Sequence, residues 1–533
     1  MITLPQTLRS ILTDELSPVS RASVTMLEVT NLHMVLFGDS VITGFVQSLL
    51  ASTTRSSTTI RVPSQLEAPL EGSSCEHRRD RVTINTLPDD VLVEIFHFYV
   101  NLWRIGTNGW HTLVHVCQRW RHVVFASPRR LNLRLEYGGK RPMSEMLEVW
   151  PALPVEISYG SDLAVSNSWE NVALALESEH RHRICQINLL DIPPSKWERF
   201  AAAMQKPLPE LSHLVFSAEK NTVTSLSDSF LGGSAPLLRE LRLEDCPFPG
   251  IITLLLSASQ LVVLDLWFIP DSGYISPQDL VTALSVLSRL EILHLGFESP
   301  LSPASRPPPP LTRSVLAALT RLEFQGVHEY LEDLLAQIEA PLLNKLHVTF
   351  FMDIDFVLPQ LLRLITHAES FNSCHRAAVR TSDSKIRFKI FRESPLFPDL
   401  SLEISCREFD RQLASLAQVC SSSFPLLSAL VQLDITGYAP QSRWEDDMET
   451  TEWLEFLAPF TAMKDLRLSD EVAPHVCQAL ERLAEERVAE VLPALQNIFL
   501  RDPDLEPKYI GGFVCARNLS GHPVEVYRWK YYS

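Results

Sequence analysis

A short hydrophobic motif, L-x-x-L-x-L, recurs along most of the chain and constrains its fold more than any other feature. It appears first as ICQINL at 184–189 and last as LQNIFL at 495–500. Its central residues are numbers 187, 214, 241, 264, 293, 322, 346, 400, 433, 466 and 498. The first seven copies follow one another at steps of 23 to 29 residues, and the step from 346 to 400 is close to two such intervals.

A period in the twenties with this leucine pattern is the signature of leucine-rich repeats. Each repeat contributes one short strand with inward-pointing leucines and a returning segment, and no repeat covers its apolar face alone. We therefore expect an α/β fold in which residues 150–502 stack into a leucine-rich-repeat-like solenoid, or horseshoe, followed by a C-terminal tail at 503–533. Residues 350–396 contain no clean repeat. Returning helices are expected at 277–290, 327–338 and 475–492.

A helical unit precedes the repeats. Pro88 suits the first turn of a helix, and Asp89 and Asp90 then lie at the positive end of the helix dipole. A second helix is expected over 110–124, and an alternating strand follows at 131–135. Because the unit spans only about 45 residues, it buries little core of its own. Apolar residues recur at helical spacing in both helices, at Val91, Leu92, Ile95, Phe96 and Tyr99 and at Leu113, Val116, Cys117, Trp120 and Val124.

The stretches LPDDVLVEIFHFY and LVHVCQRWRHVVFASPRRLNLRL resemble an F-box, at residues 82–130. The resemblance implies binding to a Skp-type adaptor and, through it, to the cullin of a ubiquitin ligase. Followed by degenerate repeats and by LSGHPVEVYRW near the end, the chain resembles fungal F-box proteins, whose repeats receive a protein substrate. For Leu92 and Trp120, packing inside the unit remains the alternative. The residues that match the motif, and that would bind the adaptor, are Leu87, Pro88, Leu92, Ile95, Phe96, Val116, Cys117 and Trp120.

Charge and composition make some classes of partner unexpected. With 47 basic and 64 acidic residues the chain carries a net charge of −17, so nucleic acid is not an expected partner. The apolar stretch at 26–52 is interrupted by polar residues and does not reach the roughly 18 uninterrupted apolar residues of a membrane span. We interpret residues 1–80 as a poorly ordered extension and linker. Nine singly spaced cysteines favour reduced thiols and an intracellular location, cytoplasmic or nuclear.

The residues between the leucines of each strand point away from the core and would line the concave face of a horseshoe. We expect Arg242, Trp267 and Arg321 to contribute to substrate binding, because aromatic and arginine side chains carry much of the energy of protein recognition. The alternative is an ordinary solvated strand surface. Other residues of this face are Glu240, Glu244, Val263, Asp265, Ile292, His294, Glu323, Gln325, Lys345, His347, Thr349, Gln432, Asp434 and Thr436.

No motif for catalysis is visible. The sequence contains no phosphate-binding glycine loop, no G-x-S-x-G turn and no H-E-x-x-H pair. We therefore expect a protein that is not an enzyme and that uses no cofactor or metal. The rival to the ligase hypothesis is a repeat scaffold whose F-box-like helices cap the solenoid without a role in ubiquitination. We interpret the proline-rich stretch at 299–312 as a surface loop and 443–457 as the start of an amphipathic helix.

Overall fold

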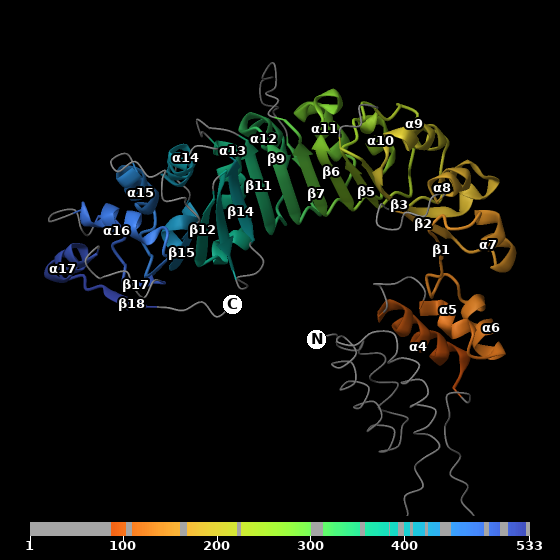
Figure 1. Ribbon diagram of the computed structural model, residues 1–533, viewed down its shortest axis with the longest axis horizontal. Helices are drawn as coiled ribbons and strands as arrows, with labels where there is room; N and C mark the ends of the chain where they lie inside the picture. Colours follow the sequence, from red (N-terminus) through yellow and green to blue (C-terminus); the bar gives the residue numbers. More distant parts are fainter. Residues whose placement is uncertain are drawn as a thin grey trace, which may run out of the picture. The chain divides into compact units, whose positions relative to one another are not determined.

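The computed structural model forms two compact units (Figure 1). One is a helical unit containing residues 87–102 and 113–127, and the other is a repeat unit containing 109–112 and the described residues from 128 onward. The expected extension at 1–80, the prolines of 300–312 and the acidic residues of 443–448 lie outside the described residues. The structure describes residues 87–102, 109–159, 168–220, 225–299, 313–351, 358–382, 384–392, 399–405, 409–421, 425–437, 449–483, 490–501 and 510–528.

The helices of the helical unit are α4 (Asp89–Leu102) and α6 (Gln118–Ala126), together with the end of α5 (Gly109–Val114). The single helix expected over 110–124 is therefore wrong, because the chain breaks between α5 and α6. Cys117 is extended there, with φ −157° and ψ 169°, and its Sγ accepts the backbone N–H of Trp120 at 3.4 Å. This cap satisfies one of the free N–H groups that begin a helix.

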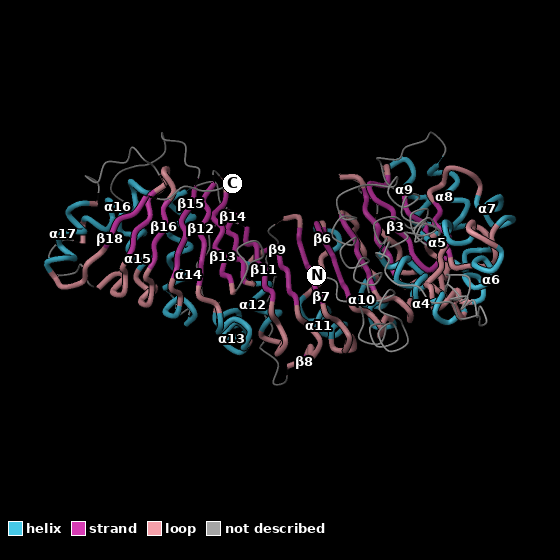
Figure 2. The backbone as a smooth tube through the Cα atoms, turned by 90° about the horizontal axis from the view of Figure 1, so that it is seen from below, coloured by secondary structure: helices cyan, strands magenta, loops and turns pink. Residues whose placement is uncertain are grey.

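The strands of the repeat unit lie side by side (Figure 2). They form one sheet of sixteen strands, fifteen of which run parallel to at least one neighbour. Their spatial order is β1 (Leu135–Tyr137), β2 (Val155–Tyr159), β3 (Ile184–Ile192), β4 (His213–Ala218), β5 (Glu240–Glu244), β6 (Val263–Ile269), β7 (Ile292–Phe297), β9 (Arg321–Gly326), β11 (Lys345–Phe351), β14 (Leu400–Ser405), β13 (Lys385–Phe391), β12 (Arg376–Ser382), β15 (Gln432–Gly437), β16 (Asp465–Leu468), β17 (Asn497–Leu500) and β18 (Glu525–Arg528).

The central residues of the repeat motif form one buried row across this sheet, as the sequence predicts. The first eight, from Ile187 to Leu400, form an unbroken series in which each of the first seven pairs directly with the next. The last three, Leu433, Leu466 and Ile498, are paired in the same way. The side chains of this row are at most 3% exposed. At about 25 cal/mol per Å² of buried apolar surface, the burial of this row stabilises the unit.

Helices cover one face of the sheet, and α9 to α13 lie along the same side of the strands in Figure 1. Neighbouring helices α10 and α11, α11 and α12, and α12 and α13 also pack against one another. We call the opposite side of strands β4 to β15, which carries the outward-pointing residues, the open face. The helices are α7 (Met143–Val149), α8 (Ser168–Glu177), α9 (Pro194–Ala203), α10 (Ile251–Ser257), α11 (Pro277–Leu284), α12 (His328–Leu335), α13 (Pro359–His367), α14 (Phe409–Ser421), α15 (Glu449–Leu457), α16 (Ala473–Glu481) and α17 (Gly511–Leu519).

The helices expected at 277–290 and 327–338 are confirmed as α11 and α12, each shorter than expected. The helix expected at 475–492 is too long, because α16 ends at Glu481 and residues 490–492 form a turn. The strand expected from 131 begins only at Leu135, because Asn132 has a left-handed φ of 51° that interrupts the extended chain.

The interval 350–396 contains a hairpin inserted into the parallel sheet. Strand β13 runs antiparallel to β12 and to β14, whereas β14 pairs in parallel with β11 and β12 pairs in parallel with β15. The chain thus reaches β12 first, returns through β13, and places β14 beside β11. The two repeat periods between 346 and 400 are filled by this return rather than by one regular unit.

The sheet extends beyond the repeats in both directions. Strands β1 and β2 precede residue 184, and β18 lies within the segment 503–533 that we expected to be a tail. That segment also contains α17, whose Arg517 is fully buried and donates to the carbonyls of Pro493 and Leu495 at 3.3 and 3.2 Å. The described part of 503–533 is therefore the last unit of the sheet. No described helix has both the length and the apolarity required to cross a membrane.

Candidate functional site

The eight F-box-like residues divide into two groups. Leu92, Phe96 and Trp120 are 0%, 1% and 8% exposed, and the Phe96 and Trp120 rings lie 4.7 Å apart. Their side chains form the core of the helical unit. For Leu92 and Trp120, this agrees with the alternative that they pack inside the unit. The others reach the surface of the unit: Pro88, Val116 and Cys117 are exposed, and Leu87 and Ile95 are partly exposed.

Arg119, near the beginning of α6, contacts residues at the beginning of α4. Its guanidinium Nη2 lies 2.7 Å from Oδ1 of Asp89 and also donates to the carbonyl of Leu87. Asp89 is in the first turn of α4, where its charge is stabilised by the helix dipole. Because Val116 and Cys117 directly precede α6, they lie at the same end of the unit as Leu87 and Pro88.

On the open face, four polar residues occupy one row across adjacent strands. The strand register pairs Arg242 of β5 with Asp265 of β6, Asp265 with His294 of β7, and His294 with Glu323 of β9. Cationic or imidazole side chains thus alternate with carboxylates along the row. Neighbouring strands of a sheet lie about 4.7–4.9 Å apart, so directly paired side chains on one face are close enough for direct contact.

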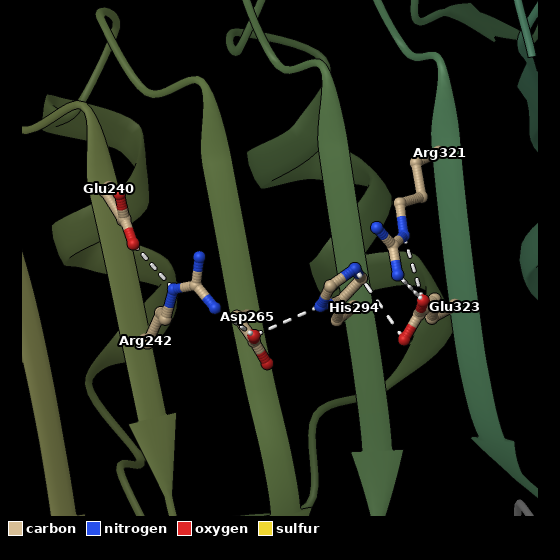
Figure 3. Close-up of polar contacts among 6 residues, drawn as sticks. All are labelled: Glu240, Arg242, Asp265, His294, Arg321 and Glu323. Atoms are coloured by element: carbon tan, nitrogen blue, oxygen red, sulfur yellow. Dashed lines mark hydrogen bonds and ion pairs between the residues drawn. The ribbon is translucent and has the colours of Figure 1, made fainter. Parts of the chain in front are cut away.

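These residues form a connected polar network (Figure 3). Oδ2 of Asp265 lies 3.1 Å from Nδ1 of His294 and 3.5 Å from Nη1 of Arg242. Nε2 of His294 lies 3.7 Å from Oε2 of Glu323. The ends of the network are held within their own strands. Nε of Arg242 donates to Glu240 at 2.6 Å, and Nε of Arg321 donates to Glu323 at 2.9 Å.

A pocket of about 320 Å³ lies over this network beside Trp267. The indole of Trp267 lies across Gly296 on the next strand, where an added Cβ would come within 2.7 Å of the ring carbon Cε3. Glycine at this position therefore lets the indole lie flat against the sheet. We call this the Trp267 pocket; it is lined by Val215, Phe216, Ser217, Arg242, Leu243, Glu244, Asp265, Trp267, His294 and Glu323.

The Trp267 pocket is rich in carboxylates. Burial raises the pKa of Glu244 above its usual value, and the neighbouring Asp245, Asp191 and Asp265 raise it further, while Lys220 opposes them. Burial also raises the pKa of Asp245. The open face at β5 to β7 thus presents a negative region around one aromatic ring and one half-exposed arginine, Arg242.

Two of the three predicted substrate-binding residues meet in this pocket. Arg242 and Trp267 line it, whereas Arg321 lies beside it and contacts it only through Glu323. Sequence reasoning did not single out His294, Glu323 or Gly296. His294 and Glu323 alternate with leucines as Arg242 does, so this signal was present, but only the strand register shows that they share a row.

His294 is the central residue of the polar network. Its Nδ1 contacts Asp265, whereas its Nε2 forms no hydrogen bond among the described residues and lies 3.7 Å from Oε2 of Glu323. Within the described ranges, no group of three or more histidine, cysteine or acidic side chains could hold a metal ion. The arrangement is suited to binding through charge and aromatic contact.

Comparison with known proteins does not assign a family. No family model matches the chain, and no curated protein matches it. Among solved structures, the chain is similar to the leucine-rich repeat-containing protein LegL7 from Legionella pneumophila, at 14% identity and a TM-score of 0.26. That match covers 60% of this chain and 94% of LegL7.

Proposed function

We propose that this chain is the non-catalytic substrate receptor of an SCF-type cullin–RING ubiquitin ligase. In this proposal the helical unit is an F-box that binds a Skp-type adaptor, and the open face of the repeats binds a protein substrate. In this proposal the receptor carries out no covalent step of ubiquitin transfer. It raises the effective concentration of a substrate lysine near the conjugating enzyme that the cullin carries.

The observation that carries the adaptor-binding proposal is the apolar surface at the shared end of α4 and α6. Val116 is 45% exposed, and Pro88 and Cys117 are exposed beside it. Exposed apolar groups gathered at one end of a small unit are typical of an interface that a partner covers. Leu92, Phe96 and Trp120 support this surface from inside and are not proposed as direct contacts.

This division of roles decides which variants test adaptor binding. Replacement of Trp120 would disturb the core of the unit, so a lost complex would not be informative. Pro88→Ala with Val116→Glu changes only exposed positions, and we expect it to weaken adaptor binding by about tenfold or more. His122→Glu, on the exposed side of α6, is the matched control and should bind as the unchanged chain does.

The substrate-binding part of the proposal rests on the Trp267 pocket. Tryptophan and arginine are enriched among the few residues that carry most of the binding energy in protein interfaces. We propose that Trp267 and Arg242 contact the substrate and that Arg321 positions Glu323. Proteins that are ubiquitinated through this receptor should no longer be ubiquitinated through the Trp267→Ala/Arg242→Glu variant. They should still be ubiquitinated through the control variant Lys206→Glu, which changes an exposed residue.

The competing possibility is a repeat scaffold in which the same helices only cap the solenoid. It predicts no complex between the intact chain and any Skp-type adaptor, and no effect of Val116→Glu on any interaction. A stoichiometric complex that Val116→Glu disrupts, in a protein that still folds, would exclude it.

A further inference from the structure

Strands β12 and β13 of the inserted hairpin carry an excess of basic side chains on the open face. The outward-pointing residues of β13 are Lys385, Arg387 and Lys389, and β12 contributes Arg376 and Arg380. Across the four strands β12 to β15, these five cations face two carboxylates, those of Glu403 and Asp434. The rest of the chain is acidic, with a net charge of −17.

Both carboxylates are already engaged. Glu403 lies 3.0 Å from Nζ of Lys385 and also pairs with Arg387. Asp434 pairs with Arg376, and its Oδ1 accepts from the amide of Gln432 at 2.9 Å. Among the described residues, the side chains of the remaining two cations, Arg380 and Lys389, form no hydrogen bond or ion pair.

The strand register brings these cations close together. In the antiparallel β12–β13 pair, Arg380 lies directly opposite Arg387, and Lys389 follows Arg387 two residues later on the same face. Like charges directly opposite one another destabilise a sheet. Burial lowers the pKa of Lys389, and Arg387 and Arg380 lower it further. The ion pairs account for Arg376, Lys385 and Arg387, but they give no structural reason for Arg380 and Lys389.

We propose that Arg380, Arg387 and Lys389, which we call the basic cluster, bind an acidic segment of a partner protein. An extended peptide places alternate side chains on one side about 6.6–6.8 Å apart, which matches the spacing of Arg387 and Lys389 along β13. Carboxylates at alternate positions would form charge-assisted hydrogen bonds with them, and Arg380 would add a second arginine fork. A long polyanion is disfavoured because the acidic remainder of the chain repels it.

This binding site goes beyond the proposed function and is independent of the adaptor. It lies on β12 and β13, separated by β11 and β14 from β9, the last strand that contributes to the Trp267 pocket. The two sites also differ in charge, because carboxylates surround Trp267 whereas cations predominate on β12 and β13. A partner that contacts both would present basic or aromatic groups at one end and acidic groups at the other.

The test is the binding of a fluorescein-labelled peptide, in which Glu alternates with Ser, to the full chain, measured by fluorescence anisotropy at low ionic strength. A peptide with Gln in place of Glu is the neutral control. We expect the Glu peptide alone to bind, with an affinity that falls as salt is added. Arg380→Glu/Lys389→Glu should weaken binding by about tenfold or more, because each lost charge-assisted contact contributes to affinity.

The matched control is Lys140→Glu/Lys206→Glu, which changes two exposed lysines and the net charge by the same amount. It should bind the Glu peptide as the unchanged chain does. Equal losses in both variants would overturn the proposal, since overall charge would then explain the binding. Stronger binding of a single-stranded oligonucleotide of equal length, lost in the cluster variant, would also overturn the assignment to an acidic protein segment.

Loss of peptide binding can be distinguished from misfolding and from loss of adaptor binding. Arg380 and Lys389 make no ion pair, so their replacement should leave the thermal denaturation midpoint unchanged or raised. If the Glu variant were to misfold, Arg380→Gln/Lys389→Gln should weaken peptide binding in the same direction. Adaptor co-purification should be unaffected by either variant, so a failure of the basic cluster and a failure of the ligase proposal give different results.

Discussion

Asp265 and His294 are joined across two parallel strands, with Oδ2 of Asp265 3.1 Å from Nδ1 of His294. The same carboxylate oxygen lies 3.5 Å from Nη1 of Arg242 on the other neighbouring strand. The side chain of Asp265 is only 16% exposed, so water supplies little of its solvation. One carboxylate therefore connects β5, β6 and β7 beneath the Trp267 pocket.

Asp265→Asn should lower the free energy of unfolding by about 1–2 kcal/mol, because the charge that Arg242 and His294 contact is removed while the shape of the side chain is kept. Urea denaturation followed by circular dichroism measures this. Glu210→Gln, at an exposed position, is the matched control and should change the midpoint little. Equal midpoints for Asp265→Asn and the unchanged chain would show that the network does not stabilise the site.

Gly437 and Thr381 make the closest approach at the junction between the hairpin and β15. A Cβ on residue 437 would lie 2.1 Å from Oγ1 of Thr381. We expect Gly437→Ala to cost about 1–3 kcal/mol, as overpacking of a core does. Because that oxygen is buried and forms no hydrogen bond, Thr381→Ala should cost little and should restore part of the loss in the double variant. Strictly additive effects would contradict this contact.

The stability of the repeat unit should fall as the pH drops below neutral, in part through His347. Burial lowers the pKa of His347, and Arg387 and Lys389 add to that lowering against Glu323 and Glu403. In the unfolded chain, His347 therefore takes up a proton at about pH 6.5, and in the folded chain it does so only at a lower pH. The contribution of neutral His347 to stability is thus complete above about pH 6.5, and it is lost as the pH falls towards the pKa of His347 in the folded chain.

His347→Gln should therefore reduce the slope of stability between about pH 7.5 and 5.5, by up to about 1.4 kcal/mol per pH unit. Denaturation midpoints measured at both pH values give this slope. His213→Gln should act in the same direction, because burial also lowers the pKa of His213. A slope unchanged in both variants would exclude these histidines as the source of the pH dependence.

Arg380→Glu should stabilise the protein, by about 0.5–1 kcal/mol, because a like-charge pair with Arg387 becomes an opposite-charge pair. Stabilisation together with loss of peptide binding is typical of a residue kept for function rather than for folding. Thermal denaturation at low salt measures the change. A lower midpoint for Arg380→Glu than for the exposed control Lys206→Glu would indicate that Arg380 has an unrecognised structural role.

The repeated row of leucines could be predicted from the sequence because every regular repeat places one central residue at the same depth. Spacing alone is enough to align the central residues from 187 to 346. The hairpin could not be predicted in this way. Strand β13 has the alternating pattern of a strand, as KIRFKIF, but no returning helix separates it from β12. Periodicity alone does not distinguish such a return from an irregular repeat.

The candidate site was predictable residue by residue but not as an arrangement. Alternation with leucine places Arg242, Trp267 and His294 on the open face. Which of them meet depends on the register between strands, which varying repeat lengths conceal. The flat position of Trp267 depends on Gly296 of the next repeat, and no local pattern links the two residues. At the N-terminal end, the F-box-like spacing identified the helices but not the break at Cys117.

The most direct test of the central claim is the mass of the species formed when the full chain of 60.3 kDa is mixed with a Skp-type adaptor, measured by light scattering during size-exclusion chromatography. We expect a one-to-one complex that persists in His122→Glu and dissociates in Pro88→Ala/Val116→Glu, with unchanged circular dichroism in both variants. Separate elution of the intact chain and the adaptor would contradict the ligase proposal and favour the repeat scaffold.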